Sequence, residues 1–188
     1  MPFSSDKLPP APCKGRRGFL KTLAVAGLMG SAGARALVAN EGARELGFLN
    51  LHTGERLRVP YWENGNYVNG ALAEINHVLR DHRANEEHTI DTALLDLLSR
   101  LPRAVGNQRS FEVISGYRAP ASNEMLRSRS SGVAQGSMHL YGKAIDIRLP
   151  GSDLSKLHSA ARSLRGGGVG LYRASNFIHV DTGRVRYW

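Results

Sequence analysis

The sequence predicts an α+β fold: one small domain with an antiparallel sheet and helices packed around it. Three observations predict this fold. The chain has 188 residues, enough for one core and hardly for two. Short extended segments alternate with helical ones, without an internal repeat or an interdomain linker. The composition, 41% hydrophobic and 22% charged, is that of a folded globular protein.

The positive charge is concentrated at the start of the chain. Of the formal net charge of +9, residues 1–36 hold +5 and residues 37–188 hold +4. A mildly basic domain suits contact with an anionic polymer such as the cell wall, and equally a solvated surface. We expect no nucleic-acid binding, because residues 37–188 lack a basic patch interleaved with aromatic residues. The only cysteine, Cys13, lies in the first segment, which excludes a cysteine ligand or nucleophile from the rest.

An export signal is predicted at the start of the chain. Arg16 and Arg17 stand before Phe-Leu-Lys and an apolar run at 22–29, an order that resembles the twin-arginine signal except for Gly15, where Ser or Thr is usual. The run is too short and too rich in Ala and Gly to span a bilayer, which takes about 20 strongly apolar residues. The alternative is a basic amphipathic helix of a cytoplasmic protein.

The signal predicts where the rest of the chain works. We expect residues 1–36 to pass through the twin-arginine exporter and to be removed after Ala34-Arg35-Ala36, with Ala39 as a second cleavage choice. Residues 37–188 would then form the periplasmic domain, with no stable membrane span.

The first half of that domain predicts a hairpin and two helices. Extended segments at 46–51 and 55–59 are joined by His52-Thr53-Gly54. A helix capped by Asn69 runs to about Arg80. A second helix, capped by Thr89 or Asp91, has leucines at helical spacing and ends at Pro102. Asp81-His82-Arg83 is expected to cap and brace helices.

The second half predicts three strands and two helices. Strands are expected at 111–115, 143–149 and 177–181, and Pro120 opens a short helix. Another helix spans about 153–164 and ends at three glycines, 166–168. Residues 127–137, rich in Ser, Arg and Gly, are interpreted as a mobile loop beside a site.

Strand parity predicts that chemically active side chains meet on the sheet. Asp146 points away from the core side of its strand, opposite Ile145 and Ile147. His179 and Asp181 likewise share one face of the later strand. Pairing the two strands therefore brings Asp146 beside His179.

A third candidate ligand precedes the first of these strands. His139 has the wrong parity for one continuous strand, but Gly142 permits a turn that swings it back. Two imidazoles and one carboxylate suit zinc and leave its fourth position open for water, which marks a catalytic site for peptide hydrolysis without a covalent intermediate. The alternative is a hydrogen-bonded polar cluster without metal.

Three motifs resemble those of the zinc D-alanyl-D-alanine peptidase group, which includes VanX-like dipeptidases and wall-cleaving endopeptidases. They are Ser-x-His-x-x-Gly-x-Ala-x-Asp at 137–146, His-x-Asp at 179–181 and Ser-Gly-Tyr-Arg-x-Pro at 115–120. Residues 49–55, 79–83 and 183–188 look like one branch of that group, the exported YcbK (MepK) murein endopeptidases.

The resemblance implies a function and its residues. Zn²⁺ would be held by His139, Asp146 and His179, and peptide stems of peptidoglycan would be cut at a cross-link, one candidate being the bond between two diaminopimelate residues. Arg118 would stabilise the oxyanion, with a salt-bridge role as the alternative. We also expect Tyr117, Asn123 and Ser137 to bind substrate. Tyr187 and Trp188 are expected to close the core, with stacking on substrate as the alternative.

One departure from the group concerns the general base. Many members carry a Glu three residues before the last histidine, where this chain has Asn176, which cannot take a proton from water. Asp181 is the substitute candidate, either as the base or as the group that orients His179. The departure also leaves open a rival hypothesis, a zinc-holding peptidoglycan-binding module without turnover.

Overall fold

A computed structural model describes residues 42–130 and 132–188 of the chain. The predicted export signal, residues 1–36, lies outside the described residues. Among the described helices, none is long and apolar enough to cross a membrane.

The described chain forms an α+β domain around one mixed sheet of eight strands, in the order β3-β2-β1-β4-β5-β7-β6-β8. The β1–β4 and β6–β8 pairs are parallel and the other neighbours are antiparallel, so the sheet is mostly antiparallel, which confirms the predicted fold class. The strands are β1 (Arg44–Asn50), β2 (Arg56–Glu63), β3 (Asn66–Tyr67), β4 (Phe111–Ser115), β5 (Ala144–Arg148), β6 (Gly168–Tyr172), β7 (Phe177–Asp181) and β8 (Arg186–Tyr187).

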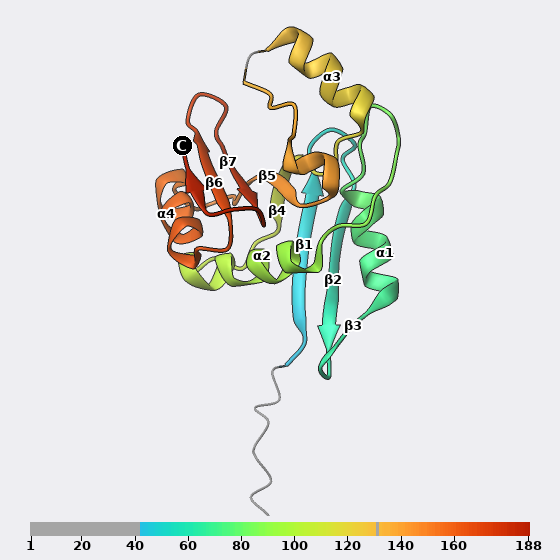
Figure 1. Cartoon of the computed structure of the whole chain (residues 1–188). Helices are drawn as coiled ribbons and strands as arrows, with labels where there is room; N and C mark the ends of the chain where they lie inside the picture. The colour runs from blue at the N-terminus through green and yellow to red at the C-terminus, as the bar shows by residue number, and fades with distance from the viewer. Residues whose placement is uncertain (1–41, 131) are drawn as a thin grey trace, which may run out of the picture. The chain divides into compact units, whose positions relative to one another are not determined.

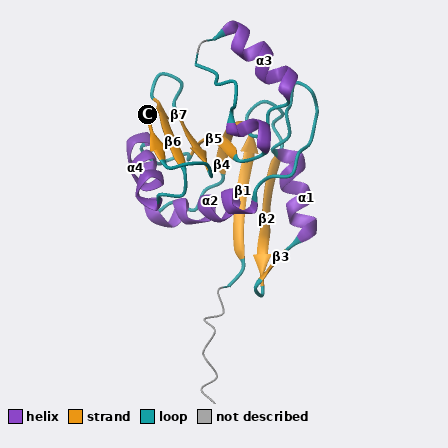
Figure 2. Cartoon of the chain, in the orientation of Figure 1, coloured by secondary structure: helices purple, strands orange, loops and turns teal. Residues whose placement is uncertain are grey.

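Three of the helices cover one face of this sheet and enclose the core. Helix α1 packs on β2, α2 on β1 and α4, and α4 on β6 and β7, while α3 lies at one end of the domain, away from the other three (Figures 1 and 2). Ile145 and Ile147 of β5 and Ile178 and Val180 of β7 are fully buried in the same core. The opposite side of these two strands carries Asp146 and His179. The helices are α1 (Asn69–Val78), α2 (Thr92–Val105), α3 (Pro120–Arg129) and α4 (Leu154–Leu164), with a 3₁₀ turn η1 (Met138–Tyr141).

Helix ends agree with the sequence in part. Asp91 caps α2 by accepting a hydrogen bond from the amide of Ala93, as predicted. Asn69 was expected to cap α1, but it is the first helical residue, and Val68 holds the cap position without a side-chain bond. Pro102 was expected to end α2, but the helix continues to Val105. Pro102 is buried, and the helix terminates at Gly106, whose φ of 72° allows the left-handed turn.

Two strands were missed next to the site. Strand β6 begins at Gly168, within the run of glycines that was expected only to end a helix. Helix α4 ends at Leu164, as expected, and Arg165 holds the cap position in a left-handed conformation with φ 50°. Strand β8 pairs with β6 in parallel at the sheet edge. Residues 127–137 are partly helical, because α3 runs to Arg129.

Candidate metal centre

The register of β5 and β7 places two candidate ligands side by side. Asp146 pairs directly with His179 in this antiparallel ladder, as strand parity predicted. Ile145 and Ile147 are fully buried on the core side, so Asp146 points to the opposite face. The two side chains face each other at 2.9 Å, from His179 Nδ1 to Asp146 Oδ1.

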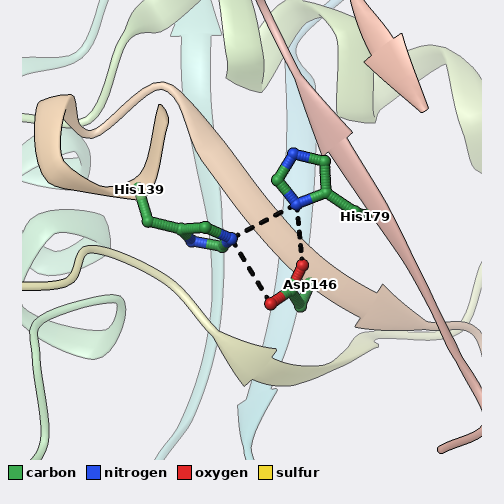
Figure 3. A group of neighbouring side chains, drawn as sticks. All are labelled: His139, Asp146 and His179. Carbon is green, nitrogen blue, oxygen red and sulfur yellow. Dashed lines mark hydrogen bonds and ion pairs between the residues drawn. The ribbon is translucent and has the colours of Figure 1, made fainter. Parts of the chain in front are cut away.

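A tight turn brings the third candidate ligand to the same place. His139 lies in η1, and Gly142 ends η1 with φ 63°, the left-handed conformation that glycine adopts without strain. A Cβ at Gly142 would also collide with the Thr89 carbonyl. The turn directs His139 back over β5, as Figure 3 shows.

The three side chains converge into one cluster (Figure 3). His139 Nε2 lies 3.3 Å from His179 Nδ1 and 3.3 Å from Asp146 Oδ2. All three residues are buried, and their ligand atoms lie within 4.8 Å of one another. Among the described residues this is the one such group that could hold a metal ion.

Hydrogen bonds on the far side of each imidazole fix which nitrogen faces the cluster. His139 Nδ1 is 2.7 Å from the Gly116 carbonyl, an acceptor, so this nitrogen donates and Nε2 is directed inward. His179 Nε2 is 3.0 Å from Asp181 Oδ2, so Nδ1 is directed inward. A carbonyl or carboxylate behind a ligand histidine is the usual arrangement at protein metal sites.

The electrostatics of the cluster favour a positive charge next to its carboxylates. Burial opposes the charged form of Asp146, but the two histidines outweigh it and hold the pKa of this carboxyl well below its usual range. Burial also opposes the charged form of His179, but hydrogen bonds to Asp146 and Asp181 outweigh it and raise its pKa. The site therefore favours positive charge beside its carboxylates, from a proton or from a metal ion.

Asp181 lies behind His179, away from the cluster. It is fully buried, and besides His179 it accepts hydrogen bonds from the amides of Gly168 and Gly183, at 2.9 and 2.8 Å. Arg186 donates to both of its oxygens, at 3.2 and 2.7 Å. Both carboxylate oxygens are thus engaged, which fixes Asp181 as an acceptor for His179.

Arg118 is buried at the edge of the cluster, with Nη2 3.8 Å from Asp146 Oδ2. Its other contacts are weak bonds to neutral oxygens, 3.3 Å each, to Asn123 and Ser115. Its backbone amide donates to the His139 carbonyl, which ties the two segments together. The guanidinium is therefore held in place without a close ion pair.

The segment carrying Arg118 is braced by Asp81. Asp81 is buried and accepts from the amide of Ala119, at the start of α3, and from the amide of Arg83. Hydrogen bonds from Ser122 and the backbone outweigh the effect of burial and lower its pKa. A fixed carboxylate thus anchors the loop between β4 and α3.

A pocket of about 450 Å³ opens over the cluster. The cluster and Arg118 form part of its lining, the loop between α3 and η1 forms another part, and aromatic residues complete it. The lining residues besides the cluster are Arg118, Ser130, Gly132, Val133, Ala134, Gly136, Ser137, Met138, Tyr172, Phe177, Arg186 and Trp188.

The residues predicted to bind substrate are spread over two layers. Ser137 lines the pocket. Asn123 is buried behind it, between Arg118 and the Ala134 carbonyl. Tyr117 is buried in the core and stacks on His88, with ring centroids 4.7 Å apart. The structure thus brings Ser137 to the pocket, places Asn123 behind the lining, and leaves Tyr117 in the core outside the lining.

Two expectations about the end of the chain need revision. Tyr187 and Trp188 were expected to close the core, but they are 39% and 49% exposed, and Trp188 lines the pocket. Tyr172, Phe177 and Arg186 also line it and were missed. The aromatic residues on either side of the His-x-Asp motif were the sequence feature that could have indicated this part of the pocket. Asn176 is exposed in the turn between β6 and β7 with φ 53°, outside the pocket lining.

Together, the sheet and the buried His-Asp-His cluster define a small α+β domain with a candidate metal centre of the hydrolase type. Residues 38–188 match the family described as peptidoglycan L,D-endopeptidase MepK. The chain belongs to this family.

Curated relatives agree with the assignment. The chain is 43% identical to peptidoglycan L,D-endopeptidase MepK of Escherichia coli K12 over 155 residues, which is 82% of this chain and 85% of that protein. The same figures hold for MepK of Shigella flexneri. The probable MepK of Haemophilus influenzae is 43% identical over 81% of this chain and 83% of its own. No solved structure matches the chain.

Proposed function

We propose that this protein is a zinc-dependent peptidase that hydrolyses peptide cross-links of peptidoglycan. The observation that carries the proposal is the buried cluster of His139, Asp146 and His179 at the base of a pocket. Membership of the MepK family supports the substrate class, because the relatives are named peptidoglycan L,D-endopeptidases.

The donor set fits zinc. Two imidazole nitrogens and one carboxylate are common ligands of catalytic zinc sites, which keep a fourth position open. The inward-facing donor atoms are 2.9 to 3.3 Å apart. Ligands about 2.1 Å from a tetrahedral zinc ion lie roughly 3.4 Å from one another, so little movement is needed to bind the ion.

Zinc would supply a water with a pKa near 7 and would polarise the scissile carbonyl. The chain's own residues supply the rest. Arg118 presents a desolvated positive charge beside Asp146, where it can stabilise negative charge developing on the carbonyl oxygen. Its weak bonds to Asn123 and Ser115 hold the guanidinium without neutralising it.

We assign Asp181 the orienting role and not that of general base. It is fully buried and bonded to His179, two amides and Arg186, so neither oxygen is directed at a water in the pocket. Asp146 has the one carboxylate side chain among the described lining residues. The orienting role fits a carboxylate that fixes the tautomer of a metal ligand.

A periplasmic location after twin-arginine export completes the proposal. It is supported by the ordered motif at Arg16 and Arg17 and by a substrate that lies outside the inner membrane. Replacing both arginines by lysine should trap the precursor inside the cell. Normal export of the double variant would contradict the twin-arginine route.

Incubation with cross-linked murein tests the enzymatic activity directly. The purified protein should convert dimeric muropeptides to monomers, stop when a chelator is added, and recover with zinc. His139→Ala should be inactive, and Tyr187→Ala, a variant outside the pocket lining, should behave as the wild type.

The rival function is a zinc-holding, peptidoglycan-binding module without turnover. The observation in its favour is the exposed position of Asn176, where many proteins of the wider group carry a glutamate. Binding to murein with no metal-dependent loss of dimers in the same assay would establish the rival.

A further inference from the structure

Three aromatic side chains form a continuous wall on one side of the pocket. Tyr172 at the end of β6 stacks on Phe177 at the start of β7, with centroids 4.6 Å apart and planes 18° apart. Trp188 Nε1 donates to the Tyr172 hydroxyl at 2.9 Å. The Trp188 ring also lies 5.3 Å from the His179 ring, so the wall reaches the metal cluster.

The sheet determines where the Trp188 side chain lies. Gly170 is the direct partner of His179 in the β6–β7 ladder, so the two residues share a face. A Cβ at Gly170 would lie 2.5 Å from the Trp188 ring, which means that the indole occupies the space of the missing side chain. Backbone bonds join Trp188 to Val169 and Leu171 at 3.2 and 3.0 Å.

The indole is held in place, yet Trp188 remains open to solvent. Trp188 is 49% exposed and lines the pocket, while the Arg186 guanidinium lies 5.0 Å from its ring. A large apolar surface held rigidly beside a buried catalytic cluster gains binding energy at low entropic cost when a ligand covers it.

The rest of the pocket indicates what that ligand is. The loop that also lines it contributes small residues, Gly132, Val133, Ala134 and Gly136. The charge of Arg186 is offset by its two bonds to Asp181. The three aromatic side chains of the wall carry no charge, so they select by apolar contact and by stacking on peptide planes.

We propose that Trp188, with Tyr172 and Phe177, forms the subsite for the aliphatic part of the peptide beside the scissile bond, and that Trp188 determines specificity there. This inference rests on the proposed function, because it names a subsite of the same pocket. Alternating amide planes and methylene groups of an extended peptide stem match such a wall.

Fluorescence tests the subsite without turnover. The chain has two tryptophans, so a Trp62→Phe variant leaves Trp188 as the one indole reporter. A soluble cross-linked muropeptide dimer is added to this protein in the presence of a chelator, and its binding is measured in parallel by calorimetry. The Trp188 emission should change saturably, with the same Kd as the calorimetric titration.

Two results of this titration would overturn the subsite. One is calorimetric binding that leaves the Trp188 emission unchanged, and the other is no binding at millimolar dimer. Either result leaves the proposed function standing if the wild-type protein still cleaves dimers in a metal-dependent way, so the two failures are distinguishable.

Kinetics of Trp188→Ala supply the second test. Loss of a binding surface that acts equally in ground and transition states should raise KM about tenfold and leave kcat within about twofold. Trp188→Phe should recover most of the loss, and zinc affinity should not change. Tyr187→Ala is the matched control, because Tyr187 packs against Arg162 outside the pocket lining. An unchanged KM for Trp188→Ala would contradict the proposal.

Gly170→Ala tests the same wall without touching an aromatic residue. The new methyl group should displace the indole and raise KM in the manner of Trp188→Ala. Gly70→Ala is the control, because a Cβ there meets nothing within 4 Å. A wild-type KM for Gly170→Ala would overturn the claim that the indole must sit over this glycine.

Discussion

The two histidines of the cluster reach the same point by different means. His179 stands in a regular strand, and a buried carboxylate, Asp181, holds its outer nitrogen. His139 stands in a 3₁₀ turn, and a backbone carbonyl, that of Gly116, holds its outer nitrogen. The support of His179 is a side chain, which a single substitution can remove. The support of His139 is a backbone carbonyl, which depends on the conformation of the chain at Gly116.

This difference teaches where the site is vulnerable. On the His179 side the support extends through Asp181 to Arg186, a sequence of replaceable side chains. On the His139 side it depends on Gly142 and on the segment that Asp81 anchors through Ala119. Substitutions on the first side should change metal binding, and those on the second should change both metal binding and stability.

The largest effect on zinc affinity is expected when either histidine itself is removed. His139→Ala and His179→Ala each remove a donor atom, so both should lower zinc affinity by well over about 100-fold, the upper range for partners behind the ligands. Isothermal titration with zinc measures this, and turnover should vanish in both. If either variant kept wild-type affinity, that histidine would not be a ligand.

Asp181→Asn should have the next largest effect. It removes the charge behind His179 and leaves the fold nearly unchanged, so zinc affinity should fall about 10- to 100-fold. Arg186→Gln weakens the contact of Arg186 with Asp181 but keeps the two amide bonds to that carboxylate. Its zinc affinity should therefore lie between those of Asp181→Asn and the wild type. An affinity equal to the wild type in Asp181→Asn would show that His179 needs no support.

Gly142→Ala probes the other side of the cluster. A non-glycine residue in the left-handed region costs about 1–2 kcal/mol, and the new Cβ also collides with the Thr89 carbonyl. Gly65→Ala is the matched control, because its φ is 84° and a Cβ there meets nothing within 4 Å. Urea unfolding should show a larger loss in Gly142→Ala than in the control, and a smaller loss of zinc affinity than in Asp181→Asn. Equal losses of stability would remove the collision from the account.

The smallest effect concerns pH in the metal-free protein. Asp146 and Asp181 raise the folded-state pKa of His179, so protonation of His179 contributes stability below its unfolded pKa, and this is lost as pH rises through the folded pKa. The stability advantage of the wild type over Asp181→Asn should therefore shrink between pH 6 and pH 9. Chemical denaturation at both pH values measures it, and an advantage that grows with pH would contradict this sign.

The regular half of the site could be predicted from the sequence. Period-two alternation fixes which side chains share a face, and burying Ile145 and Ile147 leaves Asp146 one direction to point. The same alternation places His179 on that face once the two strands are paired, as they are in the sheet. A glycine after His139 was enough to predict the turn that completes the cluster.

The irregular parts could not be predicted because they depend on distant partners. Gly168 looks like a helix terminator, but it begins a strand, where a Cβ would lie 2.5 Å from the Asp181 carboxylate. Pro102 looks like a helix end, but tertiary packing overrides the local preference. Trp188 looks like a core residue until the space above Gly170 is known.

A crystal structure of the protein with zinc, with anomalous scattering recorded at the zinc edge, tests the central claim most directly. It should show one ion bound by Nε2 of His139, Nδ1 of His179 and a carboxylate oxygen of Asp146, each at about 2.0–2.2 Å, with Asp181 still bonded to His179. Zinc bound elsewhere, or by the opposite nitrogen of either histidine, would contradict the account.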